Sequence, residues 1–197
     1  MLVKHRYPEP PAAMRQISKT FRLFGWFGFW IQLAMVFISG LALLFANLGL
    51  TRDTHPGIGM GIFCAICGVI LLVVGIVFDF QYVRIAKGLL HEPGAVLHPR
   101  RVETIRLLRL ATFLSFAGML IALVGSGSSV AVLVAKTVSQ PPGVAIVDPN
   151  KIVRAVDVFV VLANLNLIAA HLVGTVTSFW LLDRVHHYQH LQSHSRS

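Results

Sequence analysis

The chain alternates between four long apolar runs and shorter stretches that are rich in charged residues, proline and glycine. The apolar runs lie near Leu23–Ala46, Ile58–Phe80, Leu107–Ser129 and Val158–Leu182. A helix needs about 20 apolar residues to cross the hydrocarbon core of a bilayer, and each run is long enough. The pattern therefore predicts an all-α, integral membrane four-helix bundle, and it leaves no room for a soluble catalytic domain.

The composition agrees with this pattern. The chain is 55% hydrophobic and only 13% charged, whereas an ordinary soluble domain is about 25% charged. We expect three parts: a basic N-terminal tail over 1–22, a transmembrane domain over 23–182 and a His-rich C-terminal tail over 183–197. The lipid bilayer is the first expected partner.

Two predicted helices extend beyond their apolar runs. Before the first run, Ile17, Phe21 and Phe24 fall at helical spacing among basic residues, which indicates an amphipathic lead-in lying on the membrane surface. The third helix, from Arg101 to Ser139, would be about 58 Å long at 1.5 Å per residue. Such a helix either projects well beyond the outer surface or breaks at Gly125–Ser129. Because glycine and serine pairs are common kink sites, we expect the break, followed by an outer helical segment.

The distribution of basic residues predicts the orientation. Eleven lysines and arginines lie in the N-terminal tail and the middle connection, against four in the other two connections. Cytoplasmic segments next to membrane helices carry the excess of lysine and arginine. The count places both termini in the cytoplasm. The net charge of +9 is divided among separate stretches that border the membrane, so no nucleic-acid partner is expected.

The fourth run contains four polar residues spaced seven apart, here called the polar stripe: Asp157, Asn164, His171 and Ser178. Seven residues are nearly two helical turns, so their side chains share one face. Asn166 adds an amide on another face. Polar groups inside a membrane helix are costly, so they usually face protein or a water-filled path. Two interpretations stay open: hydrogen bonding between helices, or an ion path entered from outside.

Small residues recur at intervals of three, four or seven in two other runs, and they predict the helix-packing faces. In lipid, small residues allow helix backbones to approach closely. In the second run these residues are Gly61, Gly68 and Gly75. In the third run they are Gly118, Ala122, Gly125 and Ser129.

Three kinds of side chain in or next to the apolar runs could bind a metal ion. Carboxylate and imidazole groups at Asp157 and His171 can bind divalent cations, and His171 suits iron or zinc. Cys64 and Cys67 share a helix face and are weaker candidates, because cysteine also packs as a small apolar residue. The chain has no phosphate-binding loop, nucleophile elbow or H-E-x-x-H motif, so we expect neither an enzyme nor a resident cofactor.

Four segments resemble one family of four-span membrane proteins of cyanobacteria and the chloroplast inner envelope. They are GFWIQL (28–33), YVRIAKGL (82–89), SSVAVLVAK (128–136) and AVDVFVVLANLNLIAAHLVG (155–174). Of the stripe and its neighbours, Asp157, Asn166 and His171 match the family pattern. The resemblance implies either a permease for iron or another divalent cation, or a component of the inner-envelope protein import translocon.

The leading interpretation is a permease that transports iron or another divalent cation. Because four helices enclose little space, transport would favour a homo-oligomer. The alternative is a structural or assembly subunit of a larger complex, such as a translocon or a photosynthetic complex, without transport activity. No transit peptide is visible at the start of the chain. We therefore expect the cyanobacterial branch, in the plasma or thylakoid membrane.

Overall fold

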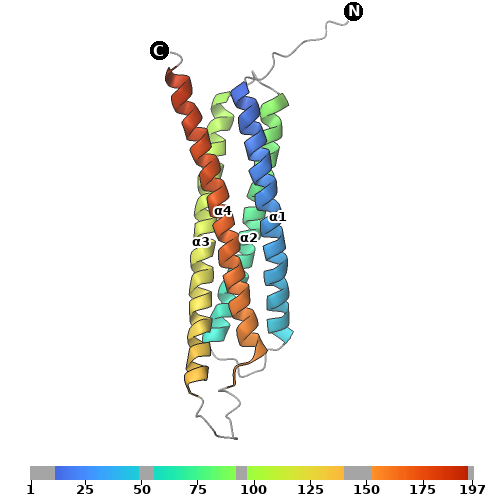
Figure 1. Cartoon of the computed structure of the whole chain (residues 1–197), viewed down its shortest axis with the longest axis vertical. Helices are drawn as coiled ribbons and strands as arrows, with labels where there is room; N and C mark the ends of the chain where they lie inside the picture. Colours follow the sequence, from blue (N-terminus) through green and yellow to red (C-terminus); the bar gives the residue numbers. More distant parts are fainter. Residues whose placement is uncertain (1–11, 49–55, 92–96, 140–151, 195–197) are drawn as a thin grey trace, which may run out of the picture.

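The computed structural model describes residues 12–48, 56–91, 97–139 and 152–194, and side chains within 18–48, 56–85, 103–139 and 152–184. It contains the four helices α1 (Ala12–Leu48), α2 (Pro56–His91), α3 (Leu97–Val138) and α4 (Ala155–His194). They run alternately up and down, so α1 begins and α4 ends at the same end of the bundle (Figure 1). We call this the termini end. The predicted all-α four-helix bundle is confirmed.

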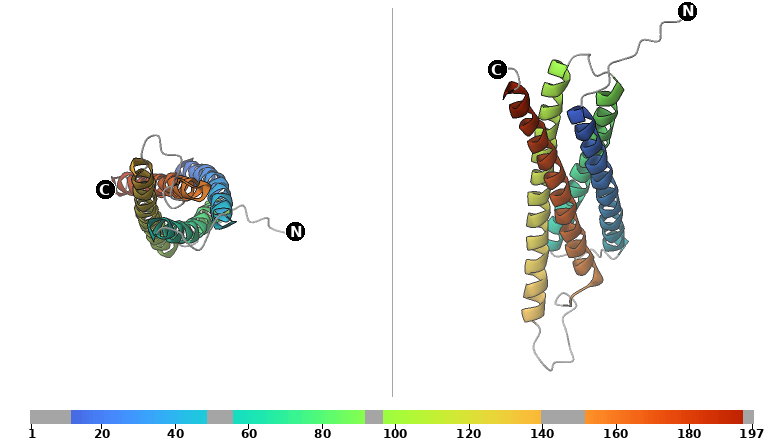
Figure 2. Two further views of the ribbon diagram at one scale, coloured as in Figure 1. Left: turned by 90° about the horizontal axis from the view of Figure 1, so that it is seen from below. Right: turned by 45° about the horizontal axis from the view of Figure 1, so that its top comes forward.

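The helices form a ring in which each helix packs against its two neighbours (Figure 2). Helix α4 lies between α1 and α3, and it also reaches across the bundle to contact α2. Within the part of the chain that the structure describes, α1 and α3 do not contact each other. Helices α2 and α4 therefore each contact all three others, and α4 has the largest share of buried residues.

Each helix contains a stretch that is long and apolar enough to cross a membrane: Ser18–Leu48, Pro56–Ile85, Glu103–Val138 and Ala155–Arg184. Large apolar side chains cover the outer surface of the bundle, including Phe37, Phe113 and Phe179, whose exposed fractions are 64% or more. Buried positions include many small or polar residues. This arrangement suits a bundle whose solvent is lipid, because the outward side chains find apolar surroundings there.

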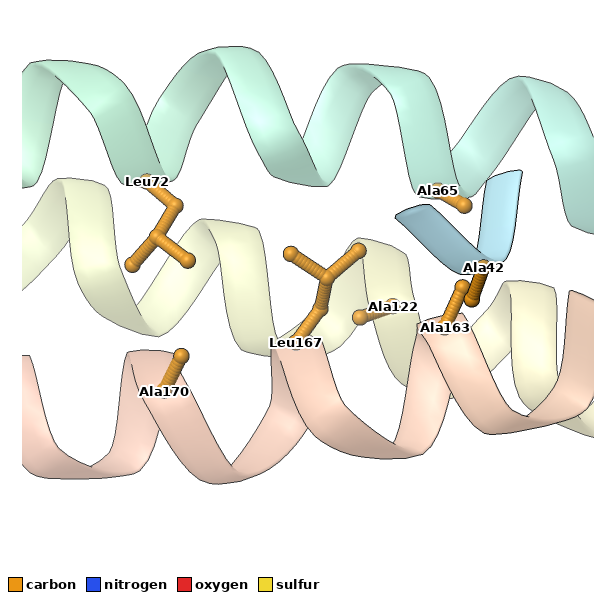
Figure 3. Packing of buried hydrophobic residues seen from close by; sticks show 7 residues of the cluster. All are labelled: Ala42, Ala65, Leu72, Ala122, Ala163, Leu167 and Ala170. Atoms are coloured by element: carbon orange, nitrogen blue, oxygen red, sulfur yellow. The ribbon is translucent and has the colours of Figure 1, made fainter. Parts of the chain in front are cut away.

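The middle of the core shows how closely the helices approach (Figure 3). Five of the seven buried residues in this cluster are alanines, and Leu72 and Leu167 fill the space between them. Leu167 projects from α4 toward α2, where a Cβ atom added at Gly68 would lie 3.1 Å from Leu167 Cδ1. Small side chains thus bring the backbones together, and few large ones complete the packing.

The predicted break in the third helix is wrong, because α3 continues as one helix from Leu97 to Val138. The Ser128 and Ser129 hydroxyls both donate to the Gly125 carbonyl within the helix, at 3.0 and 2.9 Å. Gly125 and Ser129 are also buried against neighbouring helices. The small residues here allow close packing without interrupting the helix. The α3 helix instead projects beyond its neighbours at the end opposite the termini (Figure 1).

The side of the membrane on which the termini lie stays a prediction from the distribution of basic residues. Single cysteines introduced at Thr54 and Gly94 test it, at positions outside the described residues. With Cys64 and Cys67 replaced by alanine, a membrane-impermeant maleimide added to intact cells should label Thr54→Cys and leave Gly94→Cys unlabelled until the cells are opened. The reverse labelling pattern would show that both termini face outward.

Candidate functional site

Asp157 lies in the first turn of α4, where its carboxylate caps the helix. Asp157 Oδ2 accepts a hydrogen bond from the backbone N–H of Arg154 at 3.0 Å, which satisfies one of the free N–H groups at the helix start. The same oxygen accepts a bond from Lys136 Nζ of α3 at 2.5 Å. The side chains of Lys136 and Asp157 are 10% and 4% exposed. The negative charge of Asp157 is therefore paired with the positive charge of Lys136 inside the protein.

Asn164, two turns further along α4, reaches across the bundle to α2. Its Nδ2 group donates to the Gly61 carbonyl at 3.0 Å and to the Val160 carbonyl at 2.9 Å. A Cβ atom added at Gly125 of α3 would lie only 2.5 Å from Asn164 Oδ1. That oxygen is buried and has no hydrogen-bond donor. Gly125 of α3 thus makes room for this amide, and the Gly61 carbonyl of α2 accepts a hydrogen bond from it.

His171 is held in the same way at the middle of α4. Its imidazole is 1% exposed, and Nε2 lies 3.2 Å from the Gly68 carbonyl of α2. The other side of the ring lies on α3, where a Cβ atom added at Gly118 would be 2.3 Å from His171 Cε1. Because an added methyl group would overlap the ring, glycine at position 118 is needed for this packing.

Two further polar residues of α4 link it to the remaining helices. The hydroxyls of Ser178 and Tyr82 lie 3.0 Å apart, which joins α4 to α2 near the termini end. Asn166 faces α1, where its Nδ2 group donates to the Met35 carbonyl at 2.8 Å and to Ser39 Oγ at 2.7 Å. All five candidate residues of α4 thus contact another helix, and they are not gathered around one point.

The structure does not bring the candidate metal ligands together. Among the described residues, no group of three or more histidine, cysteine, aspartate or glutamate side chains is placed to hold a metal ion. Cys64 is buried and Cys67 is half-buried, and both are free thiols. The side chains of the C-terminal histidines lie outside the described residues. A groove of about 380 Å³ between α3 and α4 is lined by three phenylalanines, two threonines, an arginine and a leucine, and by no residue of the polar stripe.

Sequence reasoning missed one buried ionisable group, Asp79 of α2. Its side chain is 2% exposed, and its Oδ2 atom accepts a hydrogen bond from Gln32 Nε2 of α1 at 2.8 Å. The predicted second span ended at Phe80, which placed Asp79 at the membrane surface, whereas the helix continues to His91 and Asp79 is buried against α1. Continuing the glycine pattern by one turn, from Gly75 to residue 79, could have found it.

Comparison with known proteins supports the family resemblance. A family model described as "Protein of unknown function (DUF3611)" matches residues 11–186. The chain is also 28% identical over 188 residues to Protein TIC 21, chloroplastic, from Arabidopsis thaliana. That alignment covers 92% of this chain and 62% of the relative's length. No solved structure matches the chain. Because the family model covers most of the sequence, the chain belongs to the DUF3611 family.

Proposed function

We propose that this protein is a structural or assembly subunit of a larger membrane complex. The observation that supports this most directly is the placement of His171. An ion site requires a ligand atom that faces open space, but this imidazole is 1% exposed, its Nε2 atom contacts the Gly68 carbonyl and its ring lies against Gly118. The resemblance implied both a permease and an import translocon component, and only the second requires no path through the bundle.

The rest of the polar stripe supports the same proposal. Asp157 would attract cations at the outer mouth of a permease, but its charge is already paired with Lys136. The Asn164 amide group and the Ser178 hydroxyl each contact α2. Interhelical hydrogen bonds are a usual means of holding membrane helices together. We therefore propose that the polar stripe holds the four helices together. The other subunits of the complex would then contact the lipid-facing surface.

Cation transport remains a second candidate because of two buried oxygen atoms. Gln32 Oε1 and Asn164 Oδ1 lie inside the bundle without hydrogen-bond donors. Amide and carboxylate oxygens are ligands for hard divalent cations. In this second proposal, the helices would separate during transport and expose these atoms, or several copies of the chain would surround a shared path. The membrane would be the cyanobacterial plasma or thylakoid membrane in either case.

Reconstituted protein distinguishes the two candidates. Purified protein in liposomes should take up Fe²⁺ no faster than protein-free liposomes if it is an assembly subunit. Membranes solubilised in mild detergent should then contain the protein in a complex that is larger than its homo-oligomer. The permease candidate instead predicts uptake that His171→Gln abolishes. Because an interhelical hydrogen bond in a membrane is worth only about 0.6 kcal/mol on average, this variant should still fold.

The lipid-facing substitution Leu172→Ile is the matched control on the same helix, since Leu172 is 50% exposed. It should affect neither uptake nor complex size. If the unmodified protein takes up Fe²⁺ and the folded His171→Gln variant does not, the assembly proposal is overturned. Protein that stays a lone homo-oligomer in its own membrane would also contradict it.

A further inference from the structure

Asp79 is buried inside the bundle with 2% of its side chain exposed, and an ionised carboxylate is costly there because it has lost its water. Charged groups at such positions usually pair with an opposite charge or face water. Among the described side chains, no lysine or arginine forms an ion pair with Asp79. The described hydrogen-bond donor to this carboxylate is the neutral amide of Gln32.

Three helices leave room for this pair by presenting glycine. A Cβ atom at Gly28 of α1 would lie 2.9 Å from Asp79 Oδ2, and one at Gly75 of α2 would lie 3.0 Å from Gln32 Oε1. A Cβ atom at Gly174 of α4 would lie 3.0 Å from Gln32 Nε2. The acid and the amide are therefore enclosed by backbone, and the fold provides space for them at the interface of α1, α2 and α4.

The Gln32 amide can form a hydrogen bond with Asp79 whether the carboxyl is ionised or protonated. As placed, its Nε2 group donates to Asp79 Oδ2, which suits a carboxylate. Its Oε1 atom is buried and has no donor. A half-turn of the amide would bring that oxygen to Asp79, where it would accept a hydrogen bond from the protonated acid. The unused acceptor and the buried acid are complementary.

We propose that Asp79 and Gln32 form a reversible proton-binding site in the interior of the bundle. The proton is carried by a carboxyl oxygen of Asp79, and rotation of the Gln32 amide accommodates its arrival and departure. Proton release leaves a negative charge between α1 and α2, in a region without a compensating cation among the described side chains. The contact between these two helices therefore depends on pH, which goes beyond the proposed assembly function.

The described residues that contact the pair are uncharged. On α1 the facing residues are Gln32 and Gly28, and on α2 the next titratable side chain is Tyr82, whose hydroxyl is bonded to Ser178 of α4. Helix α3 presents the Ser115 hydroxyl, which like Gln32 Nε2 approaches Gly174. His171 of α4 contacts the carbonyl of Gly68, which lies about three turns before Asp79 on α2. Among these described residues, Asp79 is the one that carries a carboxyl group.

Infrared difference spectroscopy on the full chain in lipid bilayers tests the proposal. A carbonyl band of a protonated carboxyl should be present at a pH at which water-exposed aspartates are ionised, and it should disappear as the pH is raised. Asp79→Asn should remove this band, whereas Asp157→Asn should leave it in place. Gln32→Leu should shift its frequency, because the carboxyl loses its hydrogen-bonding partner.

Thermal unfolding provides the second measurement. A folded state that binds a proton more tightly than the unfolded state loses stability as the pH rises. The melting temperature of the unmodified protein should therefore fall with rising pH, and that of Asp79→Asn should fall less. A band that does not titrate, or one that survives in Asp79→Asn, would overturn the proposal. Identical pH dependence of melting in the two proteins would also overturn it.

Discussion

Replacing Gly118 with alanine should destabilise the bundle by about 1–3 kcal/mol, the usual cost of overpacking a well-filled core. The added methyl group would lie 2.3 Å from His171 Cε1, well inside van der Waals contact. The imidazole cannot move away easily, because it is 1% exposed and bonded to the Gly68 carbonyl. Gly118→Leu should prevent folding. Thermal unfolding followed by circular dichroism in detergent measures both effects.

Gly127 on the same helix provides the matched control. No atom lies within 4 Å of a Cβ placed there, so Gly127→Ala should be neutral or should stabilise by up to about 1 kcal/mol through helix propensity. The double variant Gly118→Ala/His171→Ala removes the overlapping ring and should cost less than the sum of the two single variants. If Gly118→Ala and Gly127→Ala melt alike, position 118 is not a close contact.

Lys136→Ala should be the second most damaging change, with a loss of up to about 3 kcal/mol. It leaves the Asp157 carboxylate, whose side chain is 4% exposed, without its cation. An unpaired buried charge is expensive because it has lost its water and gained no partner. The remaining described hydrogen bond, from the Arg154 N–H at 3.0 Å, compensates only part of that cost.

Asp157→Asn should cost less than Lys136→Ala, although both remove the same ion pair. The asparagine oxygen can still accept the bond from Arg154, and Lys136 can turn its ammonium toward solvent at the end of α3. The double variant Lys136→Met/Asp157→Asn should be more stable than Lys136→Ala alone. Chemical unfolding of all three variants measures this order. Equal losses for the two single variants would mean that water reaches the Asp157 carboxylate.

The sequence alone determined the four helices and the faces on which they pack. Apolar length is a local property, so each membrane span could be located without knowledge of its neighbours. The spacing of Gly118 and Gly125, and of Gly61 and Gly68, likewise indicates one face on each helix. The seven-residue spacing of Asn164 and His171 placed both side chains on one face of α4. None of these inferences required knowing which helices touch.

Only the tertiary structure decided what those faces meet. Asn164 and His171 fit against glycines of α2 and α3 because α4 reaches across the bundle, and no periodicity within α4 specifies that neighbour. The pairing of Asp157 with Lys136, and of Asp79 with Gln32, joins residues far apart in the sequence. The Gly125–Ser129 segment remained helical because its neighbours pack against it. Helical periodicity determines which side chains share a face of one helix. Which residues of two helices meet depends on how all four helices pack together.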